Sequence, residues 1–239
     1  MVAQESIARL SARGAVMPDP VDPALVRAMP MVLRIEKSAP PSRQGLLEAA
    51  ARACAAACLD PRAAPDGPWA PAFDAWCAGA IRKVVRRARG AQWSAAQDLP
   101  GVTVGIDGAQ ARAYVPGPVG ELDRRLSRLQ IGGTDVPGEL PTAPSEAGLC
   151  LWLAPELPMT VGKAAAQVAH AAMLAVPLLP AEVVDDWYRD GCPLAVRQAD
   201  TGYWSRLRAA AAAGRAVAVH DAGFTEVRPG SCTVIAEWR

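Results

Sequence analysis

Short apolar runs alternate with alanine-rich segments along this chain, and the same order occurs twice. Residues 31–36 (MVLRIE) predict a short strand, and a Pro-Pro-Ser breaker then leads into an alanine-rich helix over 43–58. Residues 150–153 (CLWL) again predict a short strand, and 162–175 again predict an alanine-rich helix. This recurrence suggests an internal repeat.

A shift of 111 positions aligns the middle parts of the two halves without a gap. It pairs Trp76 with Trp187 and Trp93 with Trp204. Further identical pairs under this shift include Asp74/Asp185, Val85/Val196, Arg86/Arg197, Ala88/Ala199 and Ser94/Ser205. Tryptophan is a rare residue, so two gapless matches favour a duplication; the alternative is convergence of two ordinary α/β units.

The second half is predicted to run strand, long helix, helix, strand, helix and two strands. After the first two elements, the predicted ranges are 181–190, 194–198, 204–213, 216–220 and 233–237. This order is typical of an α/β unit in which helices cover a small mixed sheet. We therefore predict the α/β fold class, with two tandem units that each contain a mixed four-stranded sheet.

Four segments follow from this division. The predicted segments are a mobile leader over 1–29, a first unit over 30–120, a helix with a linker over 121–147, and a second unit over 148–239. Residues 121–130 (ELDRRLSRLQ) predict an amphipathic helix, and 131–147 is rich in Gly, Pro, Thr and Ser, as linkers are.

Composition argues against several classes of protein. Hydrophobic residues make up 51% of the chain, but many are alanine. No apolar run reaches the roughly 18 to 20 residues of a spanning helix, and the N-terminus lacks the apolar region of a secretory signal. We therefore expect a cytoplasmic protein with no membrane partner. The net charge of +1 gives no global sign of nucleic-acid binding.

The six cysteines are predicted to be reduced and structural. None forms a C-x-x-C pair, and only two histidines are present to complete a zinc site. The sequence also lacks a nucleotide-binding glycine loop, so we expect neither metal nor cofactor.

The first segment with candidate chemistry is 159–171 (MTVGKAAAQVAHA). Lys163, Gln167 and His170 follow i, i+4, i+7 spacing and so form one polar stripe on an alanine-rich helix. Thr160 is a predicted N-cap, and the helix N-terminus beside Lys163 would attract a phosphate or carboxylate oxygen. A merely solvated helix face is the alternative interpretation.

The second segment is 221–234 (DAGFTEVRPGSCTV). Asp221 ends an apolar strand, and Gly223 permits a tight turn. Thr225, Ser231 and Thr233 then supply hydroxyl groups near strand ends, where ligand sites of α/β sheets lie. His220 would point to the opposite face from Asp221 and is interpreted as structural. Taken alone, such a turn is more often structural than functional, because Asp and Gly favour turns in any case.

Together the two segments resemble the signatures of the type 2 peptidyl-tRNA hydrolase family. The family pattern is a Met, then Gly-Lys-x-Ala-Ala-Gln-x-x-His-Ala, and later Asp-Ala-Gly-x-Thr followed by Gly-Ser-x-Thr-Val. The resemblance covers about 90 residues, from Gly148 to the end. It implies hydrolysis of the ester that joins a peptide or an N-blocked amino acid to the tRNA 3′ end.

The resemblance also implies roles for individual residues. Asp221 would hold the attacking water, Lys163 would stabilise negative charge, Thr225 would donate a hydrogen bond and His170 would position the site. The implied substrate contacts are Gln167, Gly223, Ser231 and Thr233. A non-catalytic tRNA-binding module and a hydrolase of another acyl ester or amide remain alternatives, because fold does not fix substrate.

This chain departs from the family pattern by losing basic residues in its second half. Val161 stands where a further lysine is common, and Glu226 stands where glutamine is common. The first half instead carries five basic residues in 81–89, and Arg82, Lys83, Arg86 and Arg87 are candidates for binding tRNA. An ordinary solvated, arginine-rich segment is the alternative.

The first half resembles a degenerate copy. It has Leu46 near the position of Lys163 and Arg52 near that of His170. Since type 2 hydrolases can pair as dimers, we expect the two units to form a pseudo-dimer within one monomeric chain. The first unit would supply the charge that binds tRNA, and the second would supply the site.

Overall fold

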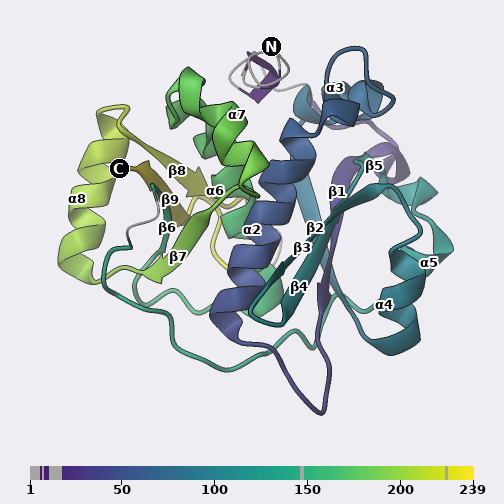
Figure 1. Ribbon diagram of the computed structural model, residues 1–239, viewed down its shortest axis with the longest axis horizontal. Helices are drawn as coiled ribbons and strands as arrows, with labels where there is room; N and C mark the ends of the chain where they lie inside the picture. Colours follow the sequence, from purple (N-terminus) through teal and green to yellow (C-terminus); the bar gives the residue numbers. More distant parts are fainter. Residues whose placement is uncertain (1–5, 7, 11–17, 146–147, 224–225) are drawn as a thin grey trace.

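Two α/β halves lie side by side in the computed structural model, which describes residues 6, 8–10, 18–145, 148–223 and 226–239 (Figure 1). Each half is built around its own mixed sheet, one of five strands and one of four. The predicted α/β fold class is confirmed. The first sheet is larger than predicted, because the chain turns back after β4 and the two-residue strand β5 (Gly117–Pro118) pairs with β1.

The two sheets have the same strand order. In the N-terminal half the order is β2 (Arg82–Ala88), β1 (Arg27–Arg34), β4 (Ala109–Tyr114), β3 (Gly101–Ile106). In the C-terminal half it is β7 (Leu194–Gln198), β6 (Leu149–Leu153), β9 (Cys232–Trp238), β8 (Ala216–His220). In both halves the first strand pairs in parallel with its neighbour on one side and antiparallel on the other. The predictions for 194–198 and 216–220 are confirmed to the residue.

From residue 18 onward, the described part of the chain contains seven α-helices. They are α2 (Arg43–Leu59), α3 (Ala70–Cys77), α4 (Gly90–Ala96), α5 (Arg124–Ser127), α6 (Val161–Ala175), α7 (Ala181–Arg189) and α8 (Thr201–Ala212). Short 3-10 turns stand at η1 (Pro23–Leu25), η2 (Pro61–Ala63), η3 (Val119–Glu121) and η4 (Val176–Leu178). Helix α8 begins three residues earlier than predicted, because the Asp200 side chain accepts from the backbone N–H of Tyr203 and so caps the helix there.

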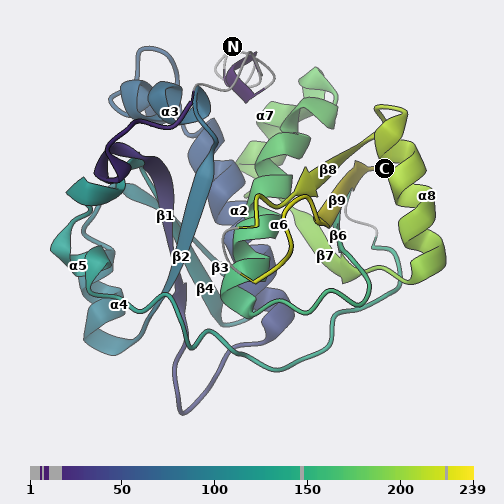
Figure 2. The same cartoon turned by 180° about the vertical axis from the view of Figure 1, so that it is seen from behind.

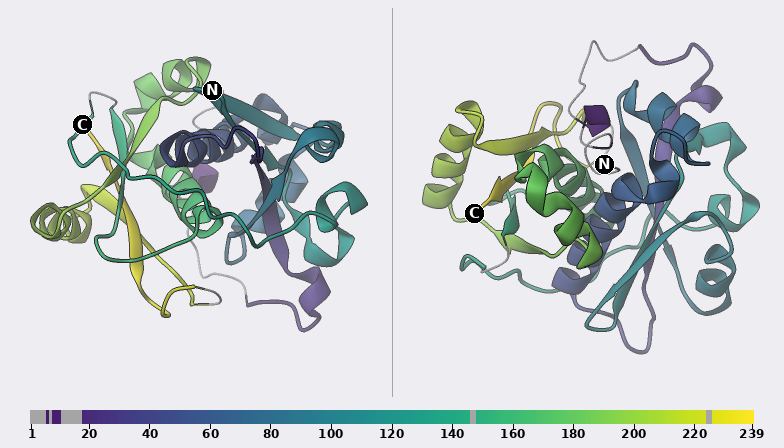
Figure 3. Two further views of the ribbon diagram at one scale, coloured as in Figure 1. Left: turned by 90° about the horizontal axis from the view of Figure 1, so that it is seen from below. Right: turned by 45° about the horizontal axis from the view of Figure 1, so that its top comes forward.

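The long helices α2 and α6 pack against each other between the two sheets (Figures 2 and 3). Both are rich in alanine, so their backbones can approach closely and bury most of both helices. Each begins at a hydroxyl N-cap: the Ser42 side chain accepts from Gly45 N, and the Thr160 side chain accepts from Lys163 N. The predicted N-cap at Thr160 is thus confirmed. These helices form the centre of one continuous core.

By length and composition alone, helix α6 and the turn after it (Val161–Leu178) are long and apolar enough to cross a membrane. Most of this stretch is buried inside the protein. The expectation that no apolar run is long enough for a spanning helix therefore missed this stretch, since its many alanines raise the mean hydropathy. Its contacts with α2 and with strands of both sheets are those of a core helix.

Details of the two halves repeat at the 111-residue spacing. The indole N–H of Trp76 donates to the Arg82 carbonyl oxygen at 2.9 Å, and that of Trp187 donates to the Pro193 carbonyl oxygen at 2.8 Å. Ile81 and Cys192, which are also 111 positions apart, have positive φ angles of 50° and 56°. Such angles are uncommon outside glycine, so their recurrence at matched positions is informative.

The predicted helix over 121–130 is largely wrong. The structure has only the turn η3 and the four-residue helix α5 there. Leu122 is extended, with φ −62° and ψ 126°, and the Asp123 side chain then caps a new helix by accepting from Arg125 N. Gln130 is not helical but forms a bridge with β2, in which its carbonyl oxygen accepts from Arg87 N at 2.9 Å.

The N-terminal boundary also differs from the prediction. Strand β1 begins at Arg27, inside the segment predicted as a leader, since Arg27 and Ala28 pair with β5. Among the described residues before it, Leu10 is buried in the core, and Arg9 Nε lies 2.6 Å from Asp74 Oδ1. This part of the predicted leader therefore packs on the N-terminal half.

Candidate active site

A nearly buried polar cluster of the C-terminal half forms around the Asp221 carboxylate. Asp221 follows β8, while Lys163 and Gln167 lie one turn apart on α6. Lys163 Nζ lies 2.5 Å from Asp221 Oδ2, and Gln167 Nε2 donates to the same oxygen at 2.8 Å. The side chains of Lys163 and Asp221 are only 11% and 8% exposed. The structure thus brings three of the predicted site residues together in a nearly buried ion pair.

A buried hydroxyl fixes the orientation of Gln167. Thr233 Oγ1 donates to Gln167 Oε1 at 2.5 Å, and Thr233 is fully buried at the start of β9. Because its oxygen is occupied by this bond, the amide presents its NH₂ group to Asp221. Thr233 therefore acts on the carboxylate through Gln167, although the sequence had suggested a direct substrate contact.

The turn after Asp221 holds the other carboxylate oxygen. Gly223 N donates to Asp221 Oδ1 at 2.7 Å, and Gly223 has a φ of +79°. A Cβ at Gly223 would lie 2.3 Å from Pro229 Cγ. The backbone of Asp221 also closes the loop, since its N–H donates to Ser231 O at 2.9 Å and its carbonyl accepts from Gly230 N at 2.7 Å. Gly223 is required here for the turn that orients the carboxylate.

Two residues that bond to the start of α6, Glu226 and Thr134, were not identified from the sequence as parts of the site. Glu226 accepts hydrogen bonds from Thr160 N at 2.8 Å and from Thr160 Oγ1 at 2.7 Å. Thr134, from the linker, is buried and accepts from Gly162 N at 3.1 Å. The only signal for Glu226 was its departure from the family glutamine, and Thr134 left no signal because its partner is 28 residues away.

His170 does not join the cluster at Asp221. Seven residues after Lys163 it lies about 10 Å farther along the helix axis. Its Nδ1 is 3.1 Å from Nζ of Lys83, which belongs to β2 in the other half. Lys83 Nζ is also 3.5 Å from Met173 Sδ and 4.8 Å from the centre of the Trp76 ring. The histidine therefore lies at the contact between the halves.

The four basic residues predicted to bind tRNA divide between two faces of β2. Side chains alternate along a strand, so Lys83 and Arg87 point to one face, and Arg82 and Arg86 to the other. Arg82 forms a two-pronged ion pair with Asp19, with both bonds 2.6 Å long. Arg87 donates to Gly132 O at 3.1 Å and also contacts the Gln130 side chain.

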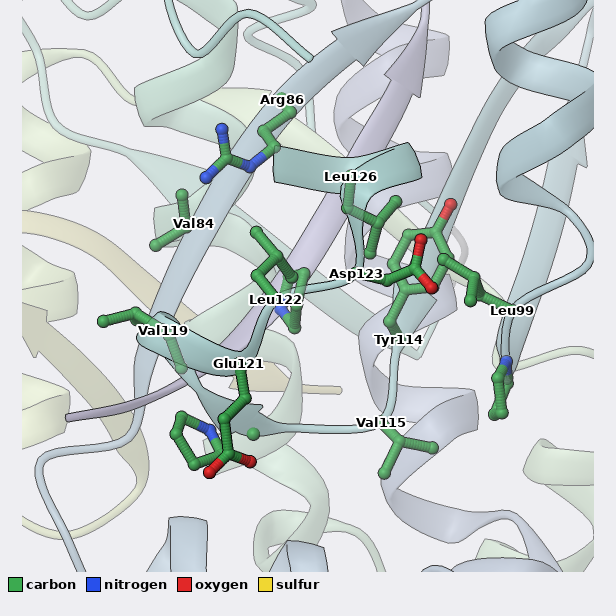
Figure 4. A pocket seen from close by; sticks show the side chains of 15 residues that line it. Val84, Arg86, Leu99, Tyr114, Val115, Val119, Glu121, Leu122, Asp123 and Leu126 are labelled. Carbon is green, nitrogen blue, oxygen red and sulfur yellow. The ribbon is translucent and has the colours of Figure 1, made fainter. Parts of the chain in front are cut away.

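Arg86 lies at a hollow in the N-terminal half. Its Nη1 donates to Leu129 O at 3.0 Å, and burial lowers the pKa of the guanidinium from its ordinary value. The hollow has a volume of about 230 Å³ and a mostly apolar wall that includes Val84, Leu122 and Leu126 (Figure 4). It lies on the sheet face opposite to the one Lys83 uses. The four basic residues thus do not form one patch.

The remaining predicted residues lie apart from the ion pair or outside the described residues. Ser231 lines a second hollow, together with His220. Thr225, the predicted hydrogen-bond donor, lies outside the residues that the structure describes. All six cysteines are free thiols. Among the described residues, no three His, Cys, Asp or Glu side chains are grouped as a metal site would need.

The cluster combines a carboxylate, an ammonium group and a helix N-terminus at the end of a strand in an α/β domain. Such a set can orient a water molecule and stabilise a developing oxyanion, as a hydrolase requires. Residues 148–237 match the family described as peptidyl-tRNA hydrolase PTH2, so the C-terminal half is a domain of that family. A search of curated proteins found no match.

Proposed function

We propose that this protein hydrolyses the ester between a peptide, or an N-blocked amino acid, and the 3′ end of tRNA. The observation that carries the proposal is the Lys163–Asp221 ion pair, supported by Gln167, inside a domain of the peptidyl-tRNA hydrolase family. At the level of the family, this domain is that of a hydrolase acting on peptidyl-tRNA.

In the proposed reaction Asp221 orients a water molecule and accepts one of its protons. The water oxygen bonds to the ester carbonyl carbon, and the Lys163 ammonium group stabilises the negative charge on the carbonyl oxygen. The bond from that carbon to the ribose 3′ oxygen then breaks, and the proton returns to this oxygen. The products are a free carboxylic acid and a tRNA with a free 3′ hydroxyl group.

We also propose that the N-terminal half is a degenerate copy and that the chain forms an intramolecular pseudo-dimer. Support comes from the shared strand order, the repeated tryptophan hydrogen bonds and the packing of α2 on α6. A tRNA-binding role for this half is part of the proposal. It rests on Arg82 and Arg87, which are half-buried and whose partners Asp19 and Gln130 lie at exposed positions.

The test is release of a labelled acyl group from N-acetyl-aminoacyl-tRNA by wild type and by Asp221→Asn. Asp107→Asn is a matched control, since Asp107 ends the corresponding strand region in the N-terminal half and is exposed. We expect release by wild type and by the control, and none by Asp221→Asn. Equal release by all three proteins would contradict the assigned site.

A non-catalytic tRNA-binding module is the second candidate. The observation that favours it is the loss of family basic residues, such as the replacement of a common lysine by Val161, which is fully buried. Binding of N-acetyl-aminoacyl-tRNA without release by wild type would support this module. Release from a simple acyl ester or amide, but not from tRNA, would instead support a hydrolase with another substrate.

A further inference from the structure

A polar hollow adjoins the Asp221 loop on the face opposite the Lys163–Asp221 pair. It has a volume of about 360 Å³, within the range of small-ligand sites. Its walls come from three places: residues 154–157 after β6, Trp204 and Arg208 on α8, and the end of β8 with the start of β9. It therefore lies where β6 and β8 end, which is where ligands of α/β sheets bind.

The hollow is joined directly to the backbone of Asp221. His220, which lines it, precedes Asp221, and Gly230 and Ser231, which also line it, hydrogen-bond to the Asp221 carbonyl and N–H. The strand pairing is irregular between Val219 and His220, as at a β-bulge. Bulges beside functional sites redirect side chains. Here His220 lines the hollow, whereas the adjacent Asp221 points to Lys163 on the other face of the sheet.

Trp204 and Arg208 give the hollow a flat apolar surface beside a positive charge. They are four residues apart on α8, so they lie on one face of the helix. Arg208 is exposed and has no hydrogen-bond or ion-pair partner within the described ranges. An aromatic face beside a cation is the usual means of binding single-stranded nucleic acid, through a stacked base and a paired phosphate.

Trp93, which aligns with Trp204 in the N-terminal half, is too buried to stack on a base. Trp93 is buried to 7% exposure beneath Leu126 and Leu129, which follow the first unit. Trp204 is only partly buried, since no described element covers it in the same way. The same residue of the repeat is therefore enclosed in one half and accessible in the other.

Glu156 adds an acceptor at the rim of the hollow. It is exposed, and its φ of 55° is uncommon for a residue other than glycine. Residues held in this region cluster at ligand sites. A carboxylate accepts from the exocyclic amino group of cytosine, whereas uracil presents an acceptor at the same position.

From this arrangement we propose that the hollow is a nucleotide subsite for a cytidine of the single-stranded C-C-A end of tRNA. The base stacks on Trp204, its amino group donates to Glu156, and its phosphate pairs with Arg208. This inference rests on the proposed function, because the terminal adenosine then carries its ester across the strand end to Lys163 and Asp221.

The first experiment compares a substrate that contains the cytidines with one that consists of the terminal adenosine ester alone. These are N-acetyl-aminoacyl-tRNA and the same acyl group on the 3′ oxygen of adenosine alone. We expect Trp204→Ala and Arg208→Ala to lower kcat/KM for the tRNA about tenfold or more, as loss of one stacked base or one phosphate contact does. Hydrolysis of the adenosine ester is expected to stay unchanged, and Trp204→Phe to restore most of the loss.

Arg206→Ala is the matched control, because Arg206 is an exposed arginine on α8 that lies over the Tyr203 ring and does not line the hollow. Equal losses on both substrates, or an equal loss in Arg206→Ala, would overturn the subsite. Circular dichroism of each variant checks that α8 is intact.

The second experiment separates the subsite from the proposed function. Binding of C-C-A and C-U-A trinucleotides is measured by calorimetry with wild type and Trp204→Ala. We expect wild type to bind C-C-A more tightly than C-U-A, and Trp204→Ala to bind neither well, whether or not the protein releases acyl groups. If wild type hydrolyses the tRNA ester but binds both trinucleotides as Trp204→Ala does, the function stands and the subsite is wrong.

Discussion

Nζ of Lys83, on strand β2 of the N-terminal half, lies 3.1 Å from Nδ1 of His170, on helix α6 of the C-terminal half. A histidine of the family signature is therefore in contact with the other half of the chain, and a lysine of the basic strand points into the protein. The N-terminal half thus contributes a side chain to the surroundings of His170, about 10 Å along α6 from Lys163.

Lys83→Met is expected to reduce turnover without changing tRNA affinity. The substitution keeps the length of the side chain but removes the group that contacts His170, so the ring loses a fixed orientation. Single-turnover rates and the salt dependence of tRNA binding check this. A fall in affinity with a smaller salt slope would show instead that Lys83 contacts a phosphate.

Thr233→Val is expected to destabilise the fold and to reduce activity together. It keeps the shape of a fully buried side chain but leaves Gln167 Oε1 without its donor, which costs about 1–3 kcal/mol. Urea unfolding gives the stability, and acyl release gives the activity. Unchanged stability would contradict the importance of this hydrogen bond.

Gly223→Ala is expected to abolish activity, because the new Cβ would collide with Pro229 and displace the turn that holds Asp221 Oδ1. Gly214→Ala is the control, since Gly214 has a similar φ of +73° but open space around it. That control should lose about 1 kcal/mol of stability from backbone strain and keep its activity. Activity in Gly223→Ala equal to that of the control would be inconsistent with the described turn.

Glu48→Ala is expected to weaken the contact between the two halves. The Glu48 carboxylate on α2 accepts from Val196 N at 3.0 Å on the edge strand β7, and Arg197 Nη1 lies 3.4 Å away. Without it a buried N–H loses its partner, at a cost of about 1–3 kcal/mol. Urea unfolding followed by tryptophan fluorescence measures the loss. Glu182→Ala, at an exposed position of α7, should have little effect.

Cys192 is expected to resist alkylation in the native protein. Burial disfavours the thiolate and raises the pKa of Cys192 to about 12, and burial likewise raises the pKa of Cys77 to about 11. Both thiols are therefore protonated at pH 8, and the reactive thiolate appears only as the pH approaches these values. Mass spectrometry after iodoacetamide treatment checks this. Rapid labelling of Cys192 at pH 8 without denaturant would contradict it.

The sequence predicted those features that depend on local pattern or on the repeat. The strands at 194–198 and 216–220, the cap at Thr160 and the proximity of Lys163, Gln167 and Asp221 all follow from spacing and from the family signatures. Trp76 and Trp187, which align in the sequence, each donate an indole hydrogen bond to the carbonyl oxygen six residues later.

Features that depend on distant partners could not be read from the sequence. The contact of His170 with Lys83 joins residues 87 positions apart, and that of Glu226 with Thr160 joins residues 66 apart. The helix predicted over 121–130 failed for a local reason, because Asp123 offers the backbone a competing cap. The order of apolar and polar residues does not show which of these competing hydrogen bonds will form.

The packing of α2 on α6 has a consequence for how this protein behaves on dilution. Both helices belong to one polypeptide, so their association is intramolecular and its effective concentration is set by the connecting segment. A contact of this kind between separate chains is lost as the protein concentration falls. Here Lys83 stays beside His170 at any concentration, so the specific activity of this protein should be the same at nanomolar as at micromolar protein.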